Sequence, residues 1–207
     1  MKTILVSVIV LICADIATGQ TPNGFNYSNY NPVTSGVFAN FTFPAAPVFR
    51  GATDDDGRKF FTLKNGIFEP EFDAHGYINR LGTYLKSVDI AHVSGDGRKE
   101  AIVVVGNLCD CSGVWFGVYI YRMTGHRPSR LLWSFQTGDR AAGGLHHVFG
   151  RNGQLVVETY GAGSGPNKLP TRGPDCAVCA RDYSQRKYAW VGNHFVARGK
   201  PRVFALT

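Results

Sequence analysis

Four cysteines, Cys109, Cys111, Cys176 and Cys179, form two short clusters with the spacings Cys-x-Cys and Cys-x-x-Cys. An even number of thiols in an oxidising compartment usually forms disulfides. Bridges between the clusters would close a loop of about 65 residues and stabilise the fold by roughly 4 kcal/mol in the chain-entropy model. A zinc site is an alternative, as is redox chemistry by Cys176 and Cys179. The sequence therefore predicts disulfides and leaves their pairing open.

The adjacent histidines His146 and His147 follow a turn that contains Asp139 and Arg140. An imidazole beside a carboxylate can act as an acid/base pair, so one hypothesis is a small exported hydrolase that uses His146 or His147 with Asp139. In a regular strand, adjacent side chains point to opposite faces, which predicts that the two histidines cannot hold one metal ion between them. A purely structural turn followed by strand histidines is the alternative.

The segment from Asp89 to Val103, DIAHVSGDGRKEAIV, contains a Gly-Asp-Gly turn. It resembles the turn of FG-GAP and VCBS-type repeats, whose loop oxygens hold calcium in extracellular β-propellers. Calcium takes six to eight oxygen ligands, and in this register only Asp96 and Glu100 supply carboxylates. The resemblance thus implies a calcium site at these two residues, whereas the residue types favour a structural turn whose glycines allow unusual backbone angles.

Aromatic side chains on expected strands suggest a binding surface. Trp115, Tyr119, Tyr121 and Trp133 would offer a flat platform for a sugar or a peptide. The alternative is that these rings complete a second layer of core.

These residues lie among short runs rich in Val, Ile, Phe, Tyr and Trp, separated by Gly, Asn and Pro, which predict an all-β fold. Expected strands are 38–43, 60–63, 84–93, 100–105, 115–123, 131–136, 146–149, 154–160, 186–190 and 194–198. Turns at Asn152-Gly153 and Gly192-Asn193 predict hairpins, and hence an antiparallel meander. A faint repeat relates the segments that begin at His92 and His147, but the chain is too short for the four or more blades of a full propeller. We expect a sandwich or a strongly twisted sheet.

The alternation of side chains predicts which faces are buried. Leu131, Trp133 and Phe135 are expected to share one face of their strand. The run from Ala101 to Val105 is apolar on both sides, which suits a central strand covered twice.

Residues 1–19 are typical of a cleavable signal peptide. Lys2 supplies a positive start, residues 4–12 an apolar centre, and Ala17 and Gly19 the small residues that a signal peptidase requires. The apolar run is shorter than the roughly 20 residues that span a bilayer. We therefore expect a flexible polar leader at 20–36, a single β domain at 37–207, and a secreted or periplasmic protein with no stable membrane span.

The chain is basic, with 22 Lys and Arg against 15 Asp and Glu and a net charge of +7. A basic surface attracts polyanions such as an acidic envelope polysaccharide, although it can also serve solubility alone. Nucleic acid is the least expected polyanion outside a cell.

Several motifs between Asn40 and Gly199 occur in a characteristic order. They are Asn-Phe-Thr-Phe-Pro at 40–44, Thr-Leu-Lys-Asn-Gly at 62–66, the Gly-Asp-Gly turn, Gly-Asp-Arg-Ala-Ala-Gly-Gly at 138–144, a cysteine-bearing loop and a closing Tyr-x-Trp-x-Gly. This order resembles a group of uncharacterised exported bacterial β-proteins. The resemblance implies a fold and export, but no activity.

No G-x-S-x-G motif, H-E-x-x-H motif or catalytic carboxylate pair is recognisable in the sequence. The favoured hypothesis is a non-catalytic binding or structural module without a cofactor. The hydrolase described above and a calcium-stabilised adhesion module are the alternatives.

Overall fold

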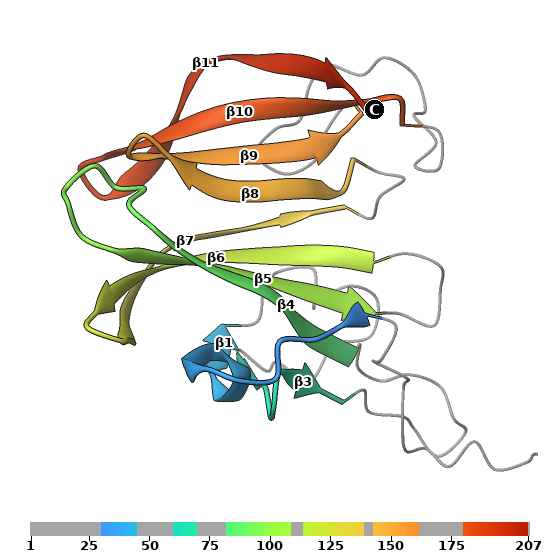
Figure 1. Ribbon diagram of the computed structural model, residues 1–207, viewed down its shortest axis with the longest axis vertical. Coiled ribbons are helices and arrows are strands. Elements are labelled where there is room, and N and C mark those ends of the chain that lie inside the picture. Colours follow the sequence, from blue (N-terminus) through green and yellow to red (C-terminus); the bar gives the residue numbers. More distant parts are fainter. Residues whose placement is uncertain are drawn as a thin grey trace, which may run out of the picture.

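The computed structural model describes residues 30–44, 60–69, 82–108, 114–138, 143–161 and 180–206. The prediction of an all-β fold is confirmed, because these residues form antiparallel sheets and one short 3-10 helix (Figure 1). The elements are η2 (Val37–Asn40), β1 (Thr42–Pro44), β2 (Phe60–Thr62), β3 (Ile67–Phe68), β4 (Gly82–Ala91), β5 (Glu100–Leu108), β6 (Val114–Thr124), β7 (Arg127–Thr137), β8 (Leu145–Arg151), β9 (Gln154–Tyr160), β10 (Asp182–Val191) and β11 (His194–Ala205).

The strands form three sheets, and the two larger ones are meanders. One has the order β3-β4-β5-β6-β7, the other β11-β10-β9-β8, and β1 pairs with β2. The predicted hairpin turns are confirmed: Asn152 and Gly153 have φ values of 51° and 70°, and Gly192 has a φ of 62°. These positive angles are the ones that tight hairpin turns require.

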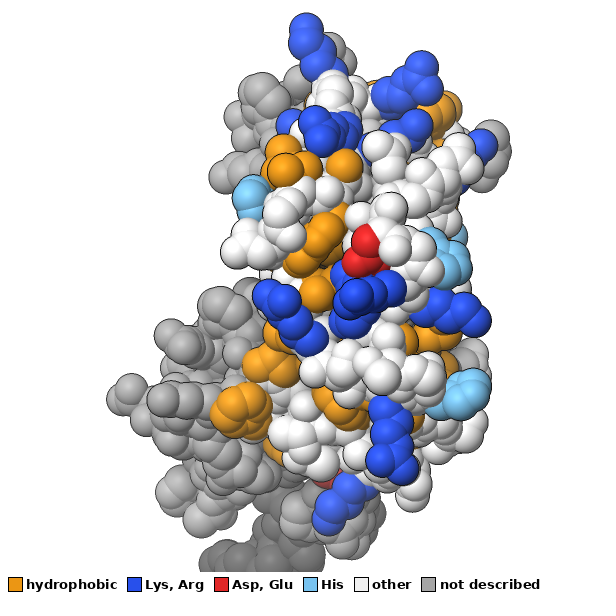
Figure 2. Space-filling view, turned by 90° about the vertical axis from the view of Figure 1, so that its left-hand side faces the viewer, with side chains coloured by type: hydrophobic (Ala, Val, Ile, Leu, Met, Phe, Trp, Pro, Cys, Tyr) orange, Lys and Arg blue, Asp and Glu red, His pale blue; other side chains and the backbone are white. Residues whose placement is uncertain are grey.

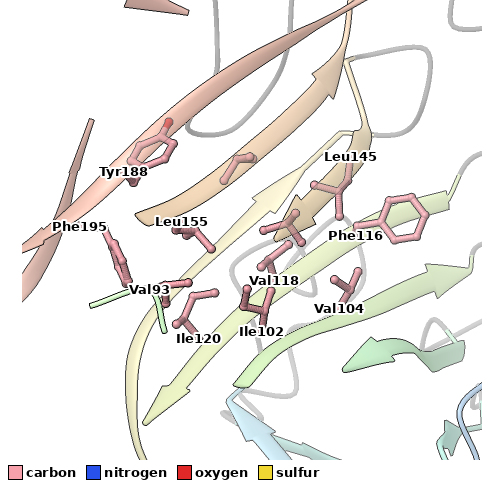
Figure 3. Close-up of a cluster of buried hydrophobic side chains, with 12 residues drawn as sticks. Val93, Ile102, Val104, Phe116, Val118, Ile120, Leu145, Leu155, Tyr188 and Phe195 are labelled. Atoms are coloured by element: carbon pink, nitrogen blue, oxygen red, sulfur yellow. The ribbon is translucent and has the colours of Figure 1, made fainter. Parts of the chain in front are cut away.

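A first core fills the space between the two larger sheets, which therefore form a sandwich. Figure 3 shows its side chains converging from both sheets, Ile102, Val104 and Val118 from one side and Leu155 and Phe195 from the other. Each such side chain contributes about 1.5–3 kcal/mol when it leaves water completely.

A second core lies on the opposite face of the five-stranded sheet, under η2, β1 and β2. Phe38 and Phe43 contact Tyr121, and Phe43 also contacts Tyr119. Residues of β5 alternate between the two cores, with Ala101, Val103 and Val105 in the second and Ile102 and Val104 in the first. The expected central strand covered on both faces is confirmed.

The hairpins of the faint repeat, β4–β5 and β8–β9, meet where their turns pack together. A side-chain carbon added to Gly95 would lie 3.8 Å from the carbonyl oxygen of Gly153. One added to Gly150 would lie 2.4 Å from the Ala91 Cβ and 2.9 Å from a Val93 methyl, so only glycine fits there. The tight turns of both sheets thus lie at one end of the molecule, the left of Figure 1. We call this the turn end: residues 92–99, 125–126, 152–153 and 192–193.

Two expectations about faces and strands need correction. The pairing of β6 with β7 shifts between Ile120 and Tyr121, which makes Leu132 an extra residue. Leu131 therefore packs with the second core, while Trp133 packs with the first, so Leu131, Trp133 and Phe135 do not share a face.

Residues 38–43, expected as one strand, begin with η2 instead. Its turn buries the consecutive side chains of Phe38 and Ala39 together, which a strand would place on opposite faces.

Residues 30–36 belong to the segment expected as a flexible leader, yet they pack against β4. The Val33 amide donates to the Leu85 carbonyl at 2.8 Å, and the Tyr30 ring lies 5.1 Å from that of Tyr84.

β11 lies at the outer edge of the four-stranded sheet. Its pairing with β10 is interrupted between Arg198 and Arg202, where Gly199 has a φ of 68°.

Candidate functional site

The Gly-Asp-Gly turn carries a polar network centred on Glu100. This carboxylate is fully buried and accepts hydrogen bonds from the amides of Val93 and Ser94, at 2.9 and 3.3 Å, and from the Ser94 hydroxyl at 2.9 Å. Arg122 of β6 forms an ion pair with Glu100 at 3.0 Å. Glu100 belongs to β5, whereas Val93 and Ser94 belong to the turn, so these hydrogen bonds hold the turn against the sheet.

Asp96 completes the network from the tip of the turn. It accepts a hydrogen bond from the Arg98 amide at 2.9 Å and pairs with Arg122 at 2.5 Å. The Ser94 hydroxyl lies 2.7 Å from Asp96 and 2.9 Å from Glu100, so its single proton is shared between the two carboxylates. Burial acts to raise the pKa of Asp96, but these hydrogen bonds and the arginine charge together hold it well below its ordinary value.

The arginine therefore pairs with both carboxylates that the resemblance implied as calcium ligands, Asp96 and Glu100. A calcium ion bound by Asp96 and Glu100 together would have to displace the Arg122 guanidinium, which pairs with both. In the described part of the chain, no group of three or more His, Cys, Asp and Glu side chains could hold a metal ion.

His146 forms the second polar network, on the outer face of the four-stranded sheet. Its Nδ1 lies 3.0 Å from Glu158, whose other oxygen accepts a 2.7 Å hydrogen bond from Gln185. An ionised carboxylate can only accept hydrogen bonds, so this contact favours the tautomer in which Nδ1 carries the proton and donates it to Glu158. The imidazole stacks on Tyr183 at 4.5 Å and meets Tyr160 edge-on at 4.9 Å.

The expectation that His146 and His147 point to opposite faces is wrong. The pairing of β8 with β9 shifts between Leu145 and His147, so His146 is the extra residue of a β-bulge. His147 lies directly opposite Glu158, and His146 contacts the same carboxylate, so both side chains are on the outer face. Asp139 and Arg140, the expected partners, lie outside the described residues.

The four rings expected as a ligand platform are not brought together. Tyr119 and Tyr121 are buried in the second core, and Trp115 extends from the same face of β6. Trp133 lies on the other face of the sheet, where it contacts Tyr188 and Phe195 in the first core.

The four cysteines of the predicted disulfides, Cys109, Cys111, Cys176 and Cys179, lie outside the described residues, as does the expected signal peptide. Both remain predictions.

A pocket that the sequence did not suggest opens beside η2 at the turn end. It has a volume of about 430 Å³, within the usual range for small-ligand sites. Residues from Val33 to Phe38 form one side, and β4 and β6 form the floor. Its apolar walls are Val33, Val37, Phe38, Val88, Ile90 and Met123. We call it the apolar pocket.

The apolar pocket continues the second core beyond the point where η2 covers it. Val88 and Met123 pack against that core, whereas Ile90 and Val37 are 52% and 42% exposed. Among the described residues of the lining, the polar side chains are Ser35, Lys99 and His126, and none is acidic.

This site could not have been found in the sequence, because its walls come from four separate segments. The sequence carries only part of the information needed to find the pocket. The alternation of side chains in β4 predicts that Val88 and Ile90 lie on the same face of the strand, but it does not show that η2 stops short of them.

Comparisons with protein-family models, with curated proteins and with solved structures find no match. The described residues contain no helix of the length and apolarity that crossing a bilayer requires.

Proposed function

We propose that this chain is an exported, non-catalytic binding module, and that the apolar pocket is where it takes up a small, largely apolar ligand. The observation that carries the proposal is the concave, unfilled extension of the second core, with Ile90 and Val37 exposed in its walls. Concave sites with mostly apolar walls and a few polar groups are the usual form of small-molecule sites.

The energetics favour a ligand over an empty pocket. Complete burial of an isoleucine side chain contributes about 1.5–3 kcal/mol. Since about half of Ile90 is exposed, a ligand that covers it gains about 1 kcal/mol, which is about fivefold in Kd. The other apolar walls add to this gain.

The test is the binding of N-phenylnaphthylamine, a neutral apolar dye whose fluorescence rises in apolar sites. Ile90→Gln is expected to weaken dye binding at least about fivefold. Val203→Gln is the matched control, because Val203 is 57% exposed but lies on β11 in the other sheet. Dye binding that is absent in the native chain, or weakened equally by both changes, would contradict the proposal.

A second candidate function rests on the pair of His146 and Glu158. Because Glu158 orients the ring through Nδ1, Nε2 of His146 is left with its lone pair and could accept a proton from water. The resulting hydroxide would attack an ester carbonyl, and the leaving alcohol would take the proton back.

This alternative replaces the expected Asp139 with Glu158 as the partner of His146. It predicts hydrolysis of p-nitrophenyl acetate that His146→Gln abolishes and His147→Gln preserves. Equal rates for the native chain and His146→Gln would exclude it.

A further inference from the structure

We infer that the ligand of the apolar pocket is an amphiphilic anion, an apolar chain that ends in a carboxylate, with its charge held at Lys99 and His126. This inference rests on the binding function proposed above and specifies the class of its ligand. It follows from the polar groups that line the pocket and from the charges around it.

The donors in the lining suit an anion. Lys99 presents an ammonium group with three donors, and Ser35 and His126 can each donate one hydrogen bond. Among the described residues, Lys99 has no acidic partner, and its backbone carbonyl is engaged only with the Met123 amide. A carboxylate would therefore not have to displace an existing ion pair.

The described acidic residues of β4, β5 and the Gly-Asp-Gly turn do not pair with Lys99. Asp96 and Glu100 are both paired with Arg122. Asp89 lies directly opposite Ile102, a residue of the first core, and so it extends from the face of the sheet opposite the apolar pocket. None of these three acids therefore competes with an anion for Lys99.

The surroundings also attract negative charge. Figure 2 looks onto the turn end and shows many Lys and Arg side chains but little exposed acid, with apolar side chains visible between them. Such a field raises the local concentration of anions and speeds their association, more so at low salt. The combination of apolar walls and a basic surround is what an amphiphilic anion would recognise.

The experiment compares three ligands with the same chain, octanoate, octanol and octylamine, as competitors of bound N-phenylnaphthylamine. We expect octanoate to displace the dye at about a tenfold lower concentration than octanol, because it adds a charge-assisted hydrogen bond. Octylamine should be the weakest of the three. The preference for octanoate should shrink as sodium chloride is raised.

Lys99→Met removes the charge and keeps an apolar stem, so it should make octanoate and octanol equivalent while leaving octanol unchanged. Lys187→Met, on β10 of the other sheet, is the matched control and should preserve the preference. His126→Gln, which retains a donor, should lower it only slightly.

The outcomes separate the two proposals. If none of the three compounds displaces the dye, the binding function itself fails. If octanol competes and octanoate is no better, the pocket binds ligands but not by their negative charge. If Lys187→Met abolishes the preference as Lys99→Met does, the negative charge is not held at Lys99, and the inference also fails.

Discussion

Replacing Arg122, the β6 residue that pairs with both carboxylates of the Gly-Asp-Gly turn network, with leucine should destabilise the protein strongly. Glu100 is fully buried, and removal of its ion-pair partner leaves an uncompensated carboxylate in the interior. Loss of one partner of a buried pair costs about 3–5 kcal/mol. The three remaining hydrogen bonds from Val93 and Ser94 place this case near 3 kcal/mol.

The measurement is urea unfolding followed by tryptophan fluorescence, together with the melting temperature. A loss of about 3 kcal/mol should lower Tm by about 10 °C for a chain of this size. Arg130→Leu is the control, because Arg130 is exposed and pairs opposite Arg122 on β7, and its loss should change stability by less than about 0.5 kcal/mol.

A double-mutant cycle with Glu100→Gln tests the reasoning directly. Neutralising the buried carboxylate should make the double variant more stable than Arg122→Leu alone by about 1–2 kcal/mol. Two results would refute the account: a loss in Arg122→Leu no larger than in Arg130→Leu, or strictly additive effects in the cycle.

Three further predictions concern the same part of the molecule. Because the pKa of Asp96 is depressed below its ordinary 3.8, its stabilising contribution is present above that pH and is lost as the pH falls through the lower folded value. Urea unfolding of Asp96→Asn should therefore show a shallower loss of stability below about pH 4 than the native chain. Gly150→Ala should cost about 1–3 kcal/mol by crowding Ala91, and Ala91→Gly in the same chain should restore part of it; no rescue would contradict the close packing. Removal of calcium with a chelator should leave the native Tm unchanged, since Arg122 already pairs with both candidate ligands, and a clear fall would overturn that assignment.

Most of the strand inventory could be predicted from the sequence, because alternation and turn residues are local signals. β9 was predicted with its observed bounds, and both hairpin turns were found from Asn152, Gly153 and Gly192. The two-residue strand β3 was missed, because it is too short to show a period.

The two errors about the direction of side chains share one physical cause. A β-bulge inserts one residue and reverses the alternation beyond it, and nothing in the local sequence marks its position. The bulges at Leu132 and His146 therefore changed which side chains share a face. The bulge at His146 also places both histidines on the face that carries Glu158.

The charged partner in each polar network could not be predicted from the local sequence either. Arg122 meets the Gly-Asp-Gly turn from another strand, and Glu158 reaches His146 across a strand pair. Sequence motifs located the turn and the histidines. The register of the sheets was needed to identify Arg122 as the cation at the turn and Glu158 as the acid beside His146.

The interrupted pairing of β11 affects whether two copies of this protein can pair through their edge strands. An edge strand offers unpaired backbone groups on which a neighbouring chain can build, and this is a route to fibrils. Here the break around Gly199 bends the strand, Pro201 lacks an amide proton, and Arg198, Lys200 and Arg202 bring like charges together when two copies approach. Part of the positive charge of this chain would thus oppose pairing between the β11 edges of two copies.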